Sequence, residues 1–516
     1  MANKSLFSSI AGKLLPRAAA VNEAGGRAYE RSPKGALAQY AATGCLNGTF
    51  YATAGEQLEK ALALAAAVDA DFVAKTAVYA RERALMKDMP ALLLAHLSAR
   101  APDAFAAAFR RVVTDARMLR TFVQIVRSGA TGRKSLGSRP KRLVREWLAA
   151  RDGDQLFRAS VGQDPSLADV VKMVHPKPAT AEHRAFYGYL LGRAHDAQLL
   201  PAMVKAYEAF KAGASSEVPD VPFLLLTALP LGRKEWAAIA RTASWQTVRM
   251  NLATFGRHGV FEEAGATETI AAKLRDRLAI RRARVFPYQL LAAWSKADDV
   301  PRAVKEALGD AMEIATENVP AIDGKVFVCP DTSGSMSSPV TGHRKGATSK
   351  VSCLDVAALV TAALLRKNPE AELLPFAEGV KQARLNPRDT VTTNAAALAA
   401  LGGGGTNCSA PLAELNRRKA KGDLVVYVSD NESWIDVRAG RGTATMEEWA
   451  RFKARNPKAK LVCIDLQPYG TTQAPDRDDV LNVGGFSDQV FDVLAAFRRD
   501  GGDGDHWAKV IEEVKL

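Results

Sequence analysis

The chain has 516 residues, more than the roughly 250 to 300 that a single hydrophobic core supports, so we expect two large domains. Hydrophobic residues make up 47% and charged residues 24%, which excludes a largely disordered chain, and no apolar run approaches the roughly 18 to 20 residues of a membrane-spanning helix. The net charge of +14 lies in the N-terminal part, because residues 1–320 hold 45 Lys and Arg against 31 Asp and Glu while the remainder holds 25 of each; this asymmetry indicates a polyanionic partner, nucleic acid or a membrane surface.

The first residues and the cysteines bear on the compartment. Lys4, Lys13 and Arg17 stand among short apolar stretches, without the ordered basic, apolar and cleavage regions of a secretory signal. The five cysteines are widely spaced and form no Cys-x-x-Cys pair, which favours a reducing compartment over a disulfide framework or a zinc site. We therefore expect a cytoplasmic protein.

Residues 55–317 show an almost wholly helical pattern, with apolar residues three and four apart and frequent breaks at Pro or Gly. Short helices joined by short turns predict stacked antiparallel pairs, as in an α-solenoid, although an irregular helical bundle would give the same pattern. We expect an all-α domain over residues 1–319. The first predicted helices are Glu56–Ala67, Asp71–Leu85, Pro90–Arg100, Pro102–Val113 and Met118–Arg127.

The sequence pattern changes at Pro320, where predicted strands begin to alternate with predicted helices. This alternation predicts a parallel, doubly wound α/β domain over residues 320–516. Ligands of such sheets bind at the carboxyl ends of the strands. The predicted strands are Lys325–Cys329, Ala371–Phe376, Asp423–Val428 and Ala459–Leu466, and the predicted helices are Cys353–Arg366, Thr393–Leu401, Met446–Ala454, Asp488–Arg499 and Trp507–Val514.

Oxygen-bearing side chains follow these strands in three loops. Asp331, Ser333 and Ser335 come directly after the first strand in an Asp-x-Ser-x-Ser motif, Thr406 follows four glycines, and Asp430 follows another strand. Two carboxylates and three hydroxyls suit Mg²⁺, whereas the absence of thiolate and imidazole disfavours zinc. We therefore predict a divalent-cation site of the von Willebrand A type, incompletely neutralised and so open to an acidic group of a partner.

Two alternatives to this metal site remain open. The serines can instead satisfy backbone groups of a turn. An aspartyl-phosphate enzyme also places an Asp after its first strand, but it needs a second acid two residues later, where this chain has Ser333. Because no general base is evident, we expect a binding protein and no enzyme, with a metal-dependent hydrolase as the weakest reading.

Seven segments, in this order along the chain, carry a resemblance to a known family. They are residues 22–26 (NEAGG), 46–51 (LNGTFY), 282–288 (RARVFPY), 331–336 (DTSGSM), 404–408 (GGTNC), 429–432 (SDNE) and 474–486. With them the chain resembles the Ro autoantigen family, whose N-terminal TROVE module is shared with telomerase and vault proteins. The resemblance covers nearly the whole chain.

The resemblance implies an RNA-binding ring that acts as a monomer. In the family, HEAT-like helix pairs curve round until the A-type domain joins their ends, small structured Y RNAs bind the basic outer surface, and single-stranded ends of misfolded RNAs enter the central hole. It further implies a role in RNA quality control, with an exoribonuclease as partner and no membrane partner. The competing hypothesis is a metal-dependent protein-interaction module that grips an acidic residue of a partner protein.

RNA-binding residues are implied only at positions that match the family. A family histidine falls on His175 and a family lysine on Arg158, whereas a second basic family position falls on Gly162, a departure. A basic stretch that contains no acidic residue from 127 to 145 can contact phosphates in its place. Its candidate residues are Arg127, Arg133, Lys134, Arg139, Lys141, Arg142 and Arg145.

Overall fold

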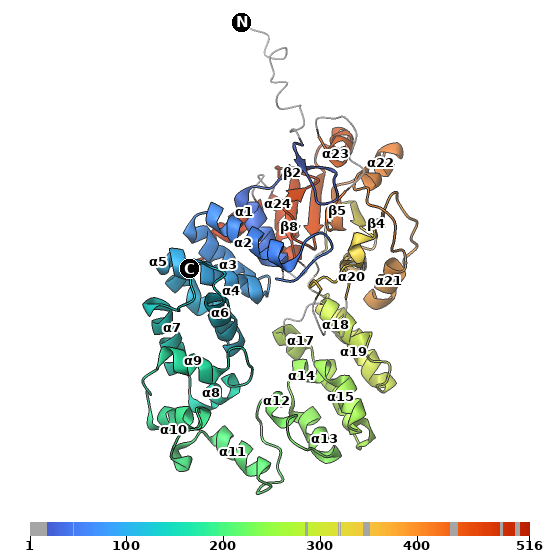
Figure 1. The fold of residues 1–516 in the computed structure, drawn as a ribbon. Coiled ribbons are helices and arrows are strands. Elements are labelled where there is room, and N and C mark those ends of the chain that lie inside the picture. The colour runs from blue at the N-terminus through green and yellow to red at the C-terminus, as the bar shows by residue number, and fades with distance from the viewer. Residues whose placement is uncertain are drawn as a thin grey trace. The chain divides into compact units, whose positions relative to one another are not determined.

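The computed structural model describes residues 18–516 except 45, 284–286, 318, 320, 344–350, 434–441, 486–488 and 501–505. The described residues form two compact units (Figure 1). The α/β unit comprises those of Met1–Val68, Arg83–Met86 and Thr316–Val514, and the helical unit comprises Asp69–Glu82, Lys87–Ala315 and Lys515–Leu516. This division differs from the boundary expected at residues 319 and 320, because the first 68 residues pack with the C-terminal part.

The α/β unit is built on a five-stranded parallel sheet in the order β4-β3-β5-β6-β8. Numbered along the chain within this sheet, the strands follow the order 2-1-3-4-5 of one common doubly wound fold. The predicted fold class is therefore confirmed for this part. The strands are β3 Val326–Pro330, β4 Glu372–Leu373, β5 Leu424–Ser429, β6 Lys460–Asp465 and β8 Val480–Gly484.

Helices cover both faces of this sheet. On one face the alternating side chains of the strands, among them Phe327, Tyr427 and Cys463, form one core cluster with Leu412, Trp449 and other residues of α22 and α23. α20 packs on β3 and β5, and α24 packs on β6 and β8. The helices are α20 Cys353–Lys367, α21 Val391–Ala399, α22 Ala410–Arg417, α23 Ala444–Arg455, α24 Gln489–Asp500 and α25 His506–Glu512.

The N-terminal segment belongs to this unit through a second, small sheet. Its strands β1 (Ala20–Val21) and β2 (Arg27–Glu30) pair with each other, and β2 pairs with β7 (Thr471–Thr472), which lies between β6 and β8 in the chain. The helices that follow are α1 (Pro33–Thr43), which packs on β8 and α25, and α2 (Ala54–Ala67). The termini of the unit are thus held together by backbone pairing.

One glycine sets how closely α1 approaches the sheet. A Cβ at Gly484 would lie 2.2 Å from Oε1 of Gln39 and 3.0 Å from Cγ2 of Thr43. We expect Gly484→Ala to lower the free energy of unfolding by about 1–3 kcal/mol, because α1 must move. Gly309→Ala, in a helix where a Cβ meets no atom within 4 Å, is the control and should raise it by roughly 0.5–1 kcal/mol. Equal effects in urea denaturation would contradict this packing.

The described residues of the helical unit contain helices and no strand, as predicted for this part. Neighbouring helices pack on one another: α3 (Ala70–Glu82) contacts α4 (Asp88–Arg100) and α5 (Pro102–Val112), and α4 contacts α6 (Ala116–Ser128). Phe105, Phe109 and Phe122 fill the centre of this group with ring centroids 5.5–5.7 Å apart. Among the described residues, every helix is too short or too polar to cross a membrane.

The remaining helices of this unit follow in chain order. They are α7 Ser138–Ala149, α8 Gly153–Ala159, α9 Leu167–Val174, α10 Ala181–Leu190, α11 Ala202–Lys211, α12 Phe223–Leu226, α13 Arg233–Thr242, α14 Trp245–Met250, α15 Leu252–Arg257, α16 Ala266–Leu274, α17 Arg277–Ala283, α18 Pro287–Trp294 and α19 Arg302–Ala315. Residues 284–286 of the motif at 282–288 lie outside the described residues. So do Phe486, the last residue of the motif at 474–486, and Asp488, the first residue of a predicted helix.

Candidate functional site

The predicted metal residues lie where the strand order of the sheet reverses. β3 lies between β4 and β5 in the sheet. After β3 the chain therefore forms a strand on one side of it, β4, and then crosses to the other side to form β5. Doubly wound sheets bind ligands at the carboxyl ends of the strands at such a point. Asp331 directly follows β3, and Asp430 directly follows β5.

Asp331 is fully buried and hydrogen-bonded through both carboxylate oxygens. Oδ1 accepts from the Ser333 backbone N–H at 2.8 Å, and Oδ2 accepts from the Ser429 hydroxyl at 2.6 Å. Burial raises the pKa of Asp331, while these hydrogen bonds oppose the shift. The strands therefore hold a carboxylate in a fixed orientation in a place that disfavours its charge.

The glycine-rich loop that carries Thr406 is joined to the Asp331 loop by its backbone. The Gly403 N–H donates to Thr332 O, and the Gly334 N–H donates to Gly404 O, both at 2.8 Å. Gly403 and Gly404 have φ of +112° and +101°, conformations that L side chains rarely adopt, so this approach requires glycine. The loop places Thr406 at the same edge of the sheet with 3% of its surface exposed.

The remaining predicted ligands interact with one another. The Ser333 and Ser335 hydroxyls lie 3.3 Å apart, and Ser335 hydrogen-bonds Asp430. Burial, and after it the charge of Asp331, raise the pKa of Asp430 to about 7. Oδ2 of Asp430 is buried without a hydrogen-bond partner among the described residues. The structure thus links four of the five predicted residues through their side chains and places Thr406 by its backbone.

This donor set fits a hard divalent cation. Burial raises the pKa of both carboxylates, and the charge of Asp331 raises that of Asp430 further. One Asp430 oxygen has no hydrogen-bond partner among the described residues, and the surrounding groups are hydroxyls, which suits such a cation. In the described part of the chain, no three His, Cys, Asp or Glu side chains lie together so that they could hold a metal ion. Any ion here must therefore be held by serine and threonine hydroxyls and water beside the two carboxylates.

Several residues at this edge were not assigned a role from the sequence. Lys381 donates through Nζ to Gly403 O at 2.8 Å and interacts electrostatically with Asp331. The Tyr51 phenol hydrogen-bonds Ser335, and burial together with Asp430 raises its pKa to about 12. Glu432 is buried; its Oε2 accepts from the Glu23 N–H at 2.8 Å. Only the motifs at 46–51 and 429–432 gave a signal for them.

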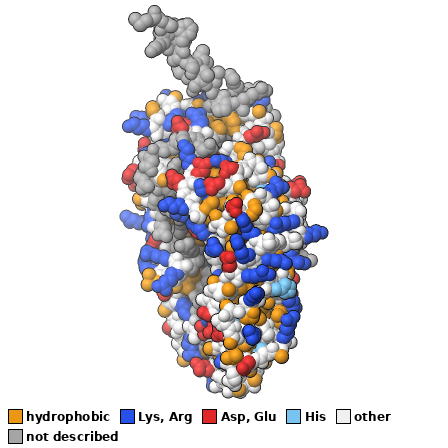
Figure 2. All heavy atoms as spheres, turned by 90° about the vertical axis from the view of Figure 1, so that its left-hand side faces the viewer, with side chains coloured by type: hydrophobic (Ala, Val, Ile, Leu, Met, Phe, Trp, Pro, Cys, Tyr) orange, Lys and Arg blue, Asp and Glu red, His pale blue; other side chains and the backbone are white. Residues whose placement is uncertain are grey.

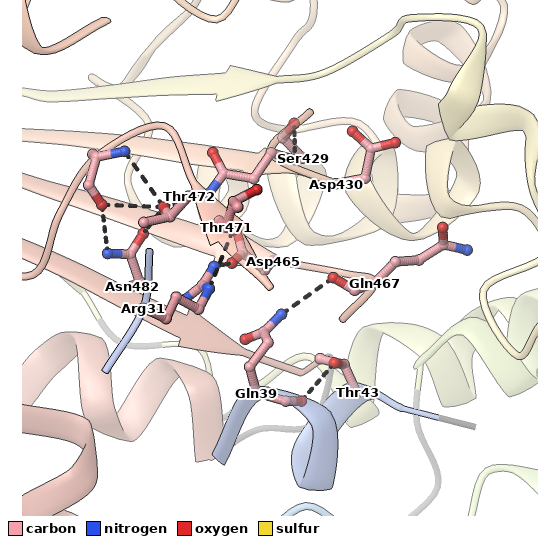
Figure 3. A network of polar contacts seen from close by, with 12 residues as sticks. Arg31, Gln39, Thr43, Ser429, Asp430, Asp465, Gln467, Thr471, Thr472 and Asn482 are labelled. Carbon is pink, nitrogen blue, oxygen red and sulfur yellow. Dashed lines mark hydrogen bonds and ion pairs between the residues drawn. The ribbon is translucent and has the colours of Figure 1, made fainter. Parts of the chain in front are cut away.

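A polar network below this edge fastens the N-terminal segment to the sheet (Figure 3). Arg31 forms a buried ion pair with Asp465 at the end of β6 and donates through Nε to Thr471 O at 3.3 Å. Gln39 of α1 donates to Gln467 O at 3.3 Å, and Thr472 donates to Oδ1 of Asn482 at 2.9 Å. The candidate metal loop at Ser429 and Asp430 lies beside this network.

The helical unit brings three of the predicted RNA-binding residues together at the end of α9. Arg127 of α6 donates to Sδ of Met173 at 3.3 Å, and Arg145 of α7 donates to Val174 O at 2.5 Å. His175 ends α9 with φ of +47° and is exposed. Figure 2 shows many Lys and Arg side chains on the face that it draws, among acidic and hydrophobic ones.

Four other candidates already have partners. Residues 127–145 contain no acidic residue, but acidic residues outside this stretch pair with some of its basic side chains. Arg139 pairs with Asp103, Arg142 lies 3.7 Å from Glu146, and Arg158 lies 2.9 Å from Asp220. These pairs are largely exposed and therefore weak. Arg133 donates to Leu136 O, whereas Lys134 and Lys141 have no ion pair or hydrogen bond among the described residues.

The structure gives a reason for the glycine at position 162, where the family has a basic residue. A Cβ at Gly162 would lie 2.4 Å from Nη2 of Arg120. The Arg120 side chain from α6 therefore occupies the space beside Gly162, and it is held there by a 3.0 Å hydrogen bond from Nη1 to Ala159 O. Positive charge is present at this place, although it comes from another helix.

Known proteins similar to this chain agree with this architecture. A family model described as the Ro60 vWA domain matches residues 325–498. The RNA-binding protein RO60 of Deinococcus radiodurans is 27% identical over 526 aligned residues, which cover 93% of this chain and 95% of that protein. The chain thus resembles Ro proteins over nearly its whole length, and its C-terminal part matches their vWA domain. The resemblance found in the sequence is thereby confirmed.

A second RO60 protein and a solved structure also match this chain. The RNA-binding protein RO60 of Caenorhabditis elegans is 24% identical over 271 residues, 48% of this chain and 39% of that protein. The crystal structure of the Deinococcus radiodurans RO (RSR) protein matches with a TM-score of 0.61 at 23% identity, covering 91% of this chain and 99% of that one. At this identity the structural match shows the fold alone.

Proposed function

We propose that this Ro-like chain is an RNA-binding protein whose helical unit carries the RNA-binding surface. The observation that carries the proposal is the charge of that unit: its residue ranges hold 38 Lys and Arg against 26 Asp and Glu, a net +12 of the chain's +14. RNA phosphates form a polyanion that such a surface attracts. The names of the RO60 relatives point in the same direction.

The cognate RNA is proposed to be a small structured, Y-like RNA, bound on the basic surface through its shape and phosphates. The residues grouped at the end of α9, Arg127, Arg145 and His175, are exposed side chains of the kind that contact backbone and protruding bases. We further propose that single-stranded ends of misfolded RNA are bound for quality control in the cytoplasm, with an exoribonuclease performing the cleavage and this chain acting without catalysis.

A second function is proposed for the α/β unit: capture of an acidic group from a protein partner through Mg²⁺. The unpartnered Oδ2 of Asp430 favours it, because a buried carboxylate oxygen without a donor is costly unless a cation approaches. Asp331, Ser333, Ser335, Thr406 and Asp430 would hold the ion. When bound, the ion would supply an open coordination position for a carboxylate.

Two unpaired lysines allow a sharp test of the RNA-binding surface. We expect Lys134→Gln/Lys141→Gln to weaken binding of a fluorescein-labelled RNA hairpin with a single-stranded tail and to reduce the slope of log affinity against log salt by about 1.4 to 1.8, the value for two lost phosphate contacts. Fluorescence anisotropy at several salt concentrations measures both quantities.

The control removes the same charge from the α/β unit. Arg417→Gln/Arg451→Gln eliminates two exposed arginines that form local ion pairs. It should leave both the affinity and the slope unchanged. Binding that is insensitive to salt in the wild-type protein would argue against the function, and equal losses in the two variants would argue against this surface.

A further inference from the structure

A second group of cations, none of them among the residues predicted from the sequence, surrounds one carboxylate at the start of α6. The carboxylate is Asp115, the N-cap residue of that helix. Arg81 lies 2.8 Å from Oδ2 of Asp115, and three other cations interact electrostatically with Asp115. A fourth, Arg117, interacts with two of these, Lys87 and Arg120. The five cations are Arg81, Lys87, Arg117, Arg120 and Arg151.

Both carboxylate oxygens of Asp115 already accept local hydrogen bonds, and its single charge cannot neutralise this group. Its Oδ1 accepts from the Met118 N–H at 2.9 Å as the helix cap, and its Oδ2 accepts from Arg81. Nε of Arg81 is buried and has no hydrogen-bond partner among the described residues. Five positive charges thus face two carboxylates, Asp115 and Asp88, the second of which interacts with Lys87, and one N–H group lacks an acceptor.

The other cations of the group bond to neutral oxygens or to none. Arg120 donates to Ala159 O, and Arg151 donates to Trp147 O at 2.6 Å and to Thr114 O at 3.3 Å. Lys87 and Arg117 are exposed and have no hydrogen bond or ion pair among the described residues. The surrounding protein and the charges of Arg117 and Arg81 lower the pKa of Lys87, as expected where like charges gather.

The helix itself extends this group into a line. Arg117, Arg120, Gln124 and Arg127 are spaced three, four and three residues apart, so they share one face of α6. Arg117, Gln124 and Arg127 are exposed and Arg120 is half-buried, whereas Met118, Leu119, Phe122, Val123 and Val126 of the opposite face are buried. At about 1.5 Å per residue the line is roughly 15 Å long, and it ends at Arg127, beside the tip of α9.

The position of these arginines is unfavourable without a ligand. A helix N-terminus carries partial positive charge and favours anions, yet Arg117 stands in the first turn of α6 and Arg120 follows in the next. In α3, α4 and α5 of this unit the first turn instead carries an acidic residue, which complements the helix dipole. An anion at this end would relieve both the dipole and the crowding of cations.

We propose that this α6 track, from Arg81, Lys87 and Arg117 through Arg120 to Arg127, binds successive phosphate groups of one single strand of RNA. The inference rests on the proposed RNA-binding function and names a contact surface for it. A linear arrangement of separated cations matches a linear polyanion, which a compact anion such as inorganic phosphate would fill at one end only.

The test uses the full chain and a fluorescein-labelled oligouridylate of twenty nucleotides. Lys87→Gln/Arg117→Gln removes the two exposed cations of the track that have no partner, and Arg302→Gln/Arg417→Gln removes two exposed cations with local ion pairs elsewhere. We expect the first variant to bind about tenfold more weakly, with a salt slope lower by about 1.4, and the second to bind as the wild type does.

The outcomes separate the track from the function. If the wild type binds neither this strand nor a structured RNA, the proposed function fails. If the wild type binds the strand and both variants bind it equally well, the track is wrong and the function stands. Stabilisation of the wild type against heat by inorganic phosphate at constant ionic strength, without binding of the oligouridylate, would also overturn the track.

Discussion

Replacing Arg31 with methionine is expected to lower the free energy of unfolding by about 3–5 kcal/mol, the usual cost of breaking a buried ion pair from one side. The side chains of Arg31 and Asp465 are each 2% exposed, so the remaining carboxylate would lie in the interior without a counter-charge. The hydrogen bond to Thr471 O would be lost as well. Urea denaturation followed by circular dichroism measures the change.

The effect of this substitution should depend on pH. Burial raises the pKa of Asp465 to about 6 even though Arg31 opposes the shift. Without Arg31 the pKa rises further, so the variant takes up a proton below it and avoids the buried charge. The loss of stability should therefore be smaller at pH 5 than at pH 8. Arg417→Met, which removes an exposed ion pair, should cost at most about 1 kcal/mol at either pH. A similar, pH-independent loss in both variants would contradict this role of Arg31.

Replacing Asp331 with asparagine is expected to reduce the stabilisation of the α/β unit by Mg²⁺ by at least about half. In the wild type, Mg²⁺ at about 100 times its dissociation constant should add about 2.7 kcal/mol to the free energy of unfolding. The variant should bind Mg²⁺ at least about tenfold more weakly, since the loss of even an outer partner costs a metal site roughly 10–100-fold. Calorimetric titration and thermal denaturation with and without Mg²⁺ measure these quantities.

The behaviour without metal distinguishes a lost ligand from a damaged fold. The charge of Asp331 raises the pKa of Asp430, so removing this charge should not lower the stability of the metal-free protein. Asp323→Asn, an exposed carboxylate of the same unit, is the matched control and should respond to Mg²⁺ as the wild type does. An undiminished Mg²⁺ response in Asp331→Asn would place any metal elsewhere.

The main sheet could be predicted because its signals are local. The strands at Val326, Leu424 and Lys460 are continuous runs of β-branched and aliphatic residues buried on both faces, a pattern that the sequence shows directly. β1, β2 and β7 have two to four residues each, and β2 pairs with β7 across more than 400 positions, so no local pattern reveals them. For the same reason the N-terminal 68 residues were assigned to the other domain.

The candidate sites were predictable to different degrees. Asp331 and Asp430 could be paired from the sequence because parallel strands bring their carboxyl ends to one edge. Tyr51 and Glu432 could not, since their approach depends on how the N-terminal segment folds back. Similarly, the basic stretch was visible in the sequence, but the acid that pairs with Arg139 comes from α5.

Crosslinking in the native host tests the central claim, RNA binding by the helical unit, most directly. RNA crosslinked to the wild-type chain by ultraviolet light would be sequenced beside RNA from the Lys134→Gln/Lys141→Gln variant expressed at the same level. We predict that the wild type enriches a small number of discrete, small structured RNAs and that the variant recovers much less of them. Equal recovery from both chains, or no species enriched over a mock purification, would contradict the account.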